Sequence, residues 1–115
     1  MKETTSDIWK IRTVKNYPEA HNHIIVGKVV SKTAEYVHMH CRTFHFARLV
    51  NSIRDVDAGI EMERVIPWSR IEIVNVLPYN FDYINAKLTT EKDSTVLLKD
   101  QKFMCPLSSY SERRY

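Results

Sequence analysis

The segment spanning residues 64–74, RVIPWSRIEIV, constrains the fold more than any other part of this chain. Its two apolar runs, 65–66 and 71–74, are rich in β-branched residues, which suit the pleated and half-buried surface of a strand. Pro67 lies between them, and because proline has no N–H to donate to a strand ladder, the first strand must end there. Four residues, 67–70, are too few for a helical crossover, so the segment predicts two strands joined by an abrupt turn.

Composition restricts the class of protein. The chain has 115 residues, of which 43% are hydrophobic, and this suits one domain with a modest core. No apolar run approaches the ~20 residues that a bilayer-spanning helix needs, and no signal-peptide pattern opens the chain. The two cysteines, Cys41 and Cys105, are too few for a disulfide framework. We therefore expect a cytoplasmic protein with reduced thiols and no membrane association.

Runs of β-branched and alternating apolar residues predict five strands. They cover residues 10–14, 23–32, 35–46, 60–66 and 71–77. In the second strand, Ile24 and Val26 point to one side and Ile25 and Val29 to the other, so its first half is expected to be buried on both faces. Gly27 interrupts that strand, and an interior glycine marks a bend or a close approach of two backbones.

The third strand has an apolar and a basic face. Alternation places Val37, Met39 and Cys41 on the inner face, and His38, His40 and Arg42 on the outer face. Two aromatic residues, Phe44 and Phe46, break this register, which predicts a second bend or a bulge.

The remaining segments are less regular. Residues 47–60 are interpreted as an extended hairpin that could include a helical turn within 48–57. Residues 95–98 and 102–105 could pair as a hairpin, whereas 79–88 could form a short helix. The last eight residues, SSYSERRY, are expected to be disordered.

Two of these features resemble the Sm/LSm family of small β-barrel proteins. The glycine between apolar runs in the second strand resembles the first Sm motif, and VIPWSR resembles the closing turn of the bacterial Hfq branch. The resemblance covers roughly residues 10–77 and implies an all-β fold, a five-stranded, strongly bent antiparallel barrel of the SH3 type. The expected organisation is an Sm-like barrel domain with an N-terminal extension at 1–78, followed by a C-terminal extension at 79–115 that packs on the barrel or trails from it.

The chain also departs from the family pattern. Its residues 32–36, KTAEY, lack the Asp and Asn that eukaryotic Sm proteins carry in this turn. Residues 68–70, WSR, replace an Arg-Gly pair, and Glu63-Arg64 replace a Lys-His pair of Hfq. The family's nucleotide-binding residues therefore do not transfer intact. These departures are consistent with the divergent Sm-like proteins of marine phage and metagenomic type.

Charge is distributed unevenly along the chain. Residues 21–54 carry five Lys or Arg and all five histidines against one acid, whereas 55–82 carry six acids and two arginines. The basic half could face phosphates, and the equally weighted alternative is a solvated face of mixed charge.

Catalytic and metal motifs are missing from the sequence. It has no phosphate-cradling glycine loop, nucleophile elbow or CxxC pair, so an enzyme is not expected. The pairs His21-x-His23 and His38-x-His40 each put two imidazoles on one strand face. Because Cys41 points away from His38 and His40, we expect exposed histidines and neither a metal site nor another cofactor.

The resemblance implies a nucleic-acid site where the turns 31–36 and 67–70 converge. Its candidate residues are Lys32 and Arg70 for phosphate or base edges, and Tyr36 and Trp68 for base stacking. For Trp68 a core-filling role is the favoured alternative, whereas Tyr36 occupies the family's base-stacking turn. The outer strip of His38, His40 and Arg42 is the next candidate.

The expected function is non-catalytic binding of RNA or single-stranded DNA by a cyclic homo-oligomer, as in Sm rings, with five to seven subunits and a role in RNA or DNA processing. The alternative is a ring-forming structural or adaptor protein that binds a protein partner through its acidic hairpin and tail.

Overall fold

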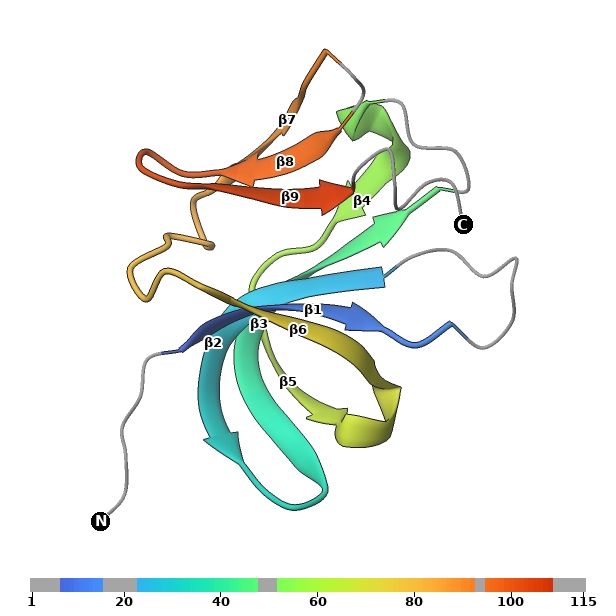
Figure 1. The fold of residues 1–115 in the computed structure, drawn as a ribbon, viewed down its shortest axis with the longest axis vertical. Helices are drawn as coiled ribbons and strands as arrows, with labels where there is room; N and C mark the ends of the chain where they lie inside the picture. Colours follow the sequence, from blue (N-terminus) through green and yellow to red (C-terminus); the bar gives the residue numbers. More distant parts are fainter. Residues whose placement is uncertain (1–6, 16–22, 48–51, 93–94, 109–115) are drawn as a thin grey trace.

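The computed structural model describes residues 7–15, 23–47, 52–92 and 95–108, which form antiparallel strands and two short 3-10 helices (Figure 1). The strands are β1 (Ile8–Thr13), β2 (His23–Lys32), β3 (Tyr36–Phe46), β4 (Val56–Ala58), β5 (Met62–Pro67), β6 (Ile71–Leu77), β7 (Lys87–Thr90), β8 (Val96–Lys99) and β9 (Met104–Ser108). The 3-10 helices are η1 (Ile53–Asp55) and η2 (Trp68–Arg70).

The strands form two antiparallel sheets. The first has the order β4-β3-β2-β1-β6, and β5 also pairs with β3; the second has the order β7-β8-β9. A mainly antiparallel all-β fold is therefore confirmed. The first sheet has six strands where five were predicted, and neither sheet closes into a barrel through backbone pairing within the described ranges.

Several strand boundaries match the sequence-based predictions. Strands β2 and β6 have the predicted bounds, and β5 ends at Pro67 as its missing N–H requires. The predicted hairpin near the C-terminus is present as β8 and β9. No helix forms over residues 79–88; these residues make turns and then enter β7, a strand that was not predicted. The predicted disordered tail lies outside the described residues, apart from Ser108.

Of the two alternatives predicted at Phe44 and Phe46, a bend or a bulge, the bulge is wrong. Strand β3 pairs without a register shift with β2 up to His45 and with β4 over residues 44–46, and the register shift between β2 and β3 lies between Val29 and Ser31. Both phenylalanines follow the alternation of β3 and lie on the same face as Arg42. They are buried because the second sheet covers that face of β3, so both faces are apolar at this end of the strand.

Two hydrophobic clusters stabilise the fold. One joins β1, β2 and β3 to the C-terminal segment, and its largest members are Phe44, Phe46, Phe81 and Tyr83. The other fills the concave side of the first sheet with Trp9, Ile11, Ile25, Val29, Val37, Met39, Cys41 and Ile66. The second sheet (orange and red in Figure 1) therefore shares a core with the first.

Gly27 allows β2 and β3 to approach each other closely. It lies opposite Cys41 on β3 and opposite Trp9 on β1. A Cβ atom at Gly27 would lie 2.2 Å from the carbonyl oxygen of His40 and 2.4 Å from the Cβ of Cys41. The predicted close approach of backbones is confirmed, because no side chain fits at this crossing.

Candidate nucleic-acid interface

The β2–β3 turn is held by the side chain of Thr33. Its hydroxyl accepts hydrogen bonds from the backbone N–H groups of Glu35 and Tyr36, both at 3.1 Å. The N–H of Thr33 donates in turn to the carbonyl of Tyr36 at 2.9 Å. Threonine in this position satisfies the donors of a tight turn without a glycine.

The β5–β6 turn is the short helix η2, and it lies against the β2–β3 turn. The indole Nε1 of Trp68 donates to the carbonyl of Thr33 at 2.8 Å, and its backbone N–H donates to the carbonyl of Glu35 at 3.2 Å. Tyr36 is also paired with Pro67 in the β3–β5 ladder. The two turns therefore lie side by side, as predicted.

An aromatic and cationic cluster lies beside these turns. The rings of Trp9 and Trp68 are 6.3 Å apart and inclined at 50°, and the Nζ of Lys32 lies 5.5 Å from the centroid of the Trp9 ring. That distance is within the range of a cation–π interaction. Lys32 itself remains exposed, so its ammonium group is oriented by an aromatic face while it stays open to solvent.

Trp68 and Tyr36 have different roles in this arrangement. Trp68 packs against the concave core, and its Nε1 is engaged by Thr33, so the core-filling interpretation describes most of its contacts. Tyr36 is half-buried, and its phenol makes no hydrogen bond with a described residue. Tyr36 is consequently the better stacking candidate of the two.

Arg70 lies in a different environment from Lys32. It lines a cleft of about 370 Å³ together with His23, Arg64 and the hydroxyl-bearing residues Thr13 and Thr43. Its backbone carbonyl accepts from the N–H of Val14 at 2.8 Å, which fixes η2 to the end of β1. Lys32 does not line this cleft, so the structure divides the predicted cations between the Trp9 cluster and the Arg70 cleft.

His23 was not predicted as a site residue of this cleft. Its ring stacks on that of His45, with centroids 4.0 Å apart, and its Nε2 is buried without a hydrogen-bond partner among the described residues. Burial, and after it the positive charges of His45, Arg64 and Arg70, together lower the pKa of His23 from its usual 6.5 to about 4. An anion in the cleft would oppose this effect, because it would offset the surrounding cations.

The predicted outer strip of His38, His40 and Arg42 is not a free cationic surface. The Arg42 guanidinium donates to the carbonyls of Gly59, Tyr83 and Ala86 at 3.1, 3.1 and 2.9 Å. His38 Nε2 lies 2.5 Å from a carboxylate oxygen of Glu63. Of the three, only His40 is exposed and makes no side-chain hydrogen bond or ion pair with a described residue. The sequence could not reveal this, because Arg42 contacts carbonyls up to 44 residues away.

The described residues offer no cluster of metal-binding side chains. No group of three or more His, Cys, Asp or Glu side chains is close enough to hold a metal ion in the described part of the chain. Cys41 is buried on the face opposite His38 and His40, and burial raises the pKa of its thiol to about 11. Within the same ranges, no helix is long and apolar enough to cross a membrane.

Comparisons with known proteins add no family assignment. No protein-family model matches the chain, and searches of curated proteins and of solved structures found no match either.

Proposed function

We propose that this protein is a non-catalytic Sm-like module that binds RNA or single-stranded DNA. The observation that carries the proposal is the contact between the two turns, since Trp68 bonds to both Thr33 and Glu35. This contact places the exposed Lys32, whose Nζ lies over the Trp9 ring, beside Trp68 at one end of the sheet, and the half-buried Tyr36 begins β3 at the same turn. A cation beside aromatic rings is the combination that binds the phosphates and bases of single strands without sequence preference.

The path of the chain supports the Sm-like assignment. Strands β5 and β6 are joined by η2 without a ladder between them, while β5 pairs with β3 and β6 pairs with β1. The order β5-β3-β2-β1-β6 is thus a curved five-stranded array interrupted only between its first and last strands. That is the arrangement expected of a strongly bent SH3-type barrel, with β4 and the second sheet as additions.

Ring assembly is supported by the character of the two strands beside this interruption. Each of β5 and β6 has one edge without a partner strand in the described structure. Both carry exposed apolar side chains, with Met62 and Val65 at 48% and 56% exposure on β5, and Ile73 and Val76 at 41% and 71% on β6. Unpaired edges of this kind favour strand addition, and one repeated heterologous contact closes a ring.

A single turn site would bind weakly, because one stacked base and one or two cations contribute a few kcal/mol at most, on the order of 1–3 kcal/mol for each base. In a ring each subunit repeats the site, and a strand held by one subunit is presented to the next at high effective concentration. We therefore expect oligonucleotides shorter than about three bases to bind poorly.

The binding experiment uses fluorescence anisotropy with labelled oligo(U) and oligo(A) at several salt concentrations. Lys32→Ala and Arg70→Ala are expected to weaken binding to both sequences and to reduce its salt dependence. Tyr36→Ala is expected to weaken binding without changing the salt dependence. Lys28→Ala is the matched control, because Lys28 is exposed on β2 outside both turns and its replacement removes an equal charge. If the Lys32 and Tyr36 variants remain intact oligomers and bind like the parent, the turn site is refuted.

The assembly experiment measures mass by light scattering behind a sizing column. The parent is expected to elute as a closed oligomer, and Val76→Lys is expected to shift it toward a monomer, since a charge would be buried at the contact. Asn75→Lys is the control, because it adds the same charge to the neighbouring residue of β6. A monomeric parent at micromolar concentration would refute ring assembly.

The second candidate function is a ring-forming adaptor that binds a protein partner. It is favoured by apolar side chains outside β5 and β6, since Ile60 and Tyr79 are 78% and 76% exposed. Salt separates the two functions, because nucleic-acid binding falls steeply as salt rises, whereas an apolar protein contact persists.

A further inference from the structure

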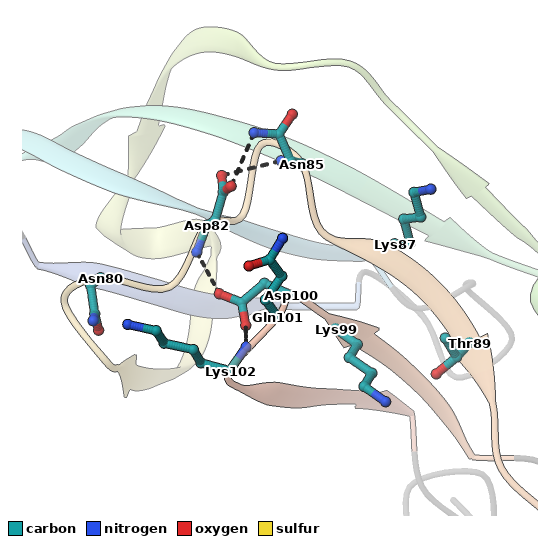
Figure 2. A pocket seen from close by; sticks show the side chains of 9 residues that line it. All are labelled: Asn80, Asp82, Asn85, Lys87, Thr89, Lys99, Asp100, Gln101 and Lys102. Carbon is teal, nitrogen blue, oxygen red and sulfur yellow. Dashed lines mark hydrogen bonds between the residues drawn. The ribbon is translucent and has the colours of Figure 1, made fainter.

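A polar pocket of about 640 Å³ lies on the C-terminal part of the molecule (Figure 2), and the second sheet to which it belongs lies at the opposite end of the molecule from the two turns (Figure 1). One wall is formed by the segment from Asn80 to Thr89, and the other by the β8–β9 turn with residues 99–102. Three of its lining residues are lysines, Lys87, Lys99 and Lys102. The pocket belongs to the part of the chain that the Sm resemblance does not cover.

The two walls are held together by the carboxylate of Asp100. Its Oδ2 accepts from the backbone N–H of Asp82 at 2.9 Å, and its Oδ1 accepts from the N–H of Lys102 at 2.7 Å (Figure 2). The carboxylate of Asp82 accepts in turn from the backbone N–H and the side-chain amide of Asn85, at 3.3 and 3.0 Å. The carboxylates of Asp82 and Asp100 therefore both accept hydrogen bonds from N–H groups of the pocket walls.

The lysines make no comparable hydrogen bonds within the described residues, and Lys102 is attracted electrostatically by the carboxylate of Asp100. In the described residues, none of the three ammonium groups donates a hydrogen bond or forms an ion pair. Lys87 and Lys99 are also directly opposite each other in the β7–β8 ladder. Like charges in such a cross-strand position destabilise a sheet. An anion that contacts both Lys87 and Lys99 would offset this repulsion. In Figure 2 the three lysine side chains extend in different directions, so a ligand that contacts all of them has to extend across the pocket.

The other lining residues restrict the kind of anion. They are the neutral hydrogen-bonding side chains of Asn80, Asn85, Thr89 and Gln101. Among the described residues no aromatic side chain lines the pocket, so these residues offer a nucleobase no ring to stack on. The volume is in the range of small-molecule sites and exceeds what a single inorganic ion needs.

We propose that this pocket binds the phosphate groups of a polyanionic ligand, with Lys87, Lys99 and Lys102 as the cationic contacts. Lysine binds phosphate as a point charge. Three lysines on two walls therefore suit a ligand with several phosphate groups better than a ligand with a single carboxylate group. The proposal is independent of the turn site, because the two share no residue.

The test is calorimetric titration of the full chain with inorganic triphosphate at low salt. Lys99→Gln is expected to weaken binding by about fivefold, and the double variant Lys87→Gln/Lys99→Gln by about 20-fold. Lys28→Gln, which removes an equal charge from an exposed position on β2, is expected to bind like the parent. Thermal unfolding of the pocket variants is expected to occur at or above the parent temperature, because a cross-strand repulsion is removed.

A second titration, with a single-stranded oligonucleotide, identifies the source of the phosphates. If the double variant loses affinity for triphosphate alone, the ligand is a free oligophosphate; if it loses affinity for both, the pocket also follows a nucleic-acid backbone. Unchanged triphosphate binding in the double variant, or an equal loss in Lys28→Gln, overturns the proposal. Lys32→Ala affects only oligonucleotide binding at the turns, so failure of either site is recognised separately.

Discussion

Arg42 provides the most direct test of how the two sheets are joined. Its guanidinium donates to the carbonyl of Gly59 and to those of Tyr83 and Ala86 at the start of the C-terminal segment. It also lies 5.2 Å from the centroid of the Phe44 ring. Replacing Arg42 with alanine removes all these donors and leaves partly buried carbonyls without partners.

The magnitude follows from the number of hydrogen bonds. A hydrogen bond to a charged group contributes about 1.5–3 kcal/mol, and partial exposure of Arg42 reduces each of its three shorter bonds to roughly 1 kcal/mol; the fourth, to Ile84 at 3.5 Å, is too long to add much. Arg42→Ala should therefore lower the free energy of unfolding by about 3 kcal/mol. For a chain of 115 residues the entropy of unfolding is about 0.24 kcal/mol per degree, so Tm should fall by about 12 °C.

Arg42→Lys separates charge from geometry. An ammonium group keeps the charge but cannot reach three carbonyls as a planar guanidinium does, so we expect it to recover about one third of the loss, on the order of 1 kcal/mol. Thermal unfolding by circular dichroism measures stability, and hydrogen exchange of residues 81–86 reports whether this segment detaches first. His40→Ala, on the same face of β3 and exposed, is the control. If Arg42→Ala is no more destabilising than this control, the guanidinium does not anchor the segment.

Three further predictions follow from single residues. Gly27→Ala should prevent folding or lower stability by more than about 3 kcal/mol, since its Cβ would overlap Cys41; soluble protein with parent-like stability would contradict this. The lowered pKa of His23 means that the unfolded chain binds a proton first as pH falls, so stability that is present above pH 6.5 should fall by about 1–3 kcal/mol toward pH 4. Urea unfolding across this range measures it, and His23→Gln should flatten the profile; an unchanged profile in that variant would contradict the assignment. Trp68→Phe keeps an aromatic ring but loses the hydrogen bond to the carbonyl of Thr33, so the free energy of unfolding, measured with urea, should fall by about 1 kcal/mol. The amide hydrogens of the β2–β3 turn should also exchange faster in this variant. Unchanged exchange would argue against the turn contact.

Local patterns accounted for the strands that are most regular. The bounds of β2 and β6 followed from β-branched runs, and the end of β5 followed from the missing N–H of Pro67. Gly27 indicated a close backbone approach because glycine is the only type of residue without a Cβ atom. These features depend on the chemistry of a few neighbouring residues, so the amino-acid sequence by itself determined them.

Features that involve distant segments were not predictable in the same way. In the sequence-based prediction, Phe44 and Phe46 lie out of register because the face of Arg42 is assigned to solvent. Alternation cannot indicate that a second sheet will cover this face of β3. Strand β4 has three residues, too few for a periodic signal, and it forms because β3 extends beyond β5 and offers an unpaired edge.

The candidate sites show the same division. The resemblance to the Sm family implied Lys32, Tyr36, Trp68 and Arg70 as candidates because of their place in two turns, and these turns do lie together. Only the tertiary structure placed Arg70 in a cleft with His23, assigned Arg42 to three backbone carbonyls, and set Lys87 opposite Lys99. A residue's type and its alternation along a strand are local properties, so the sequence by itself determines them. The partners of a side chain depend on which distant segment packs against it. This packing is decided when the two sheets bury their shared core.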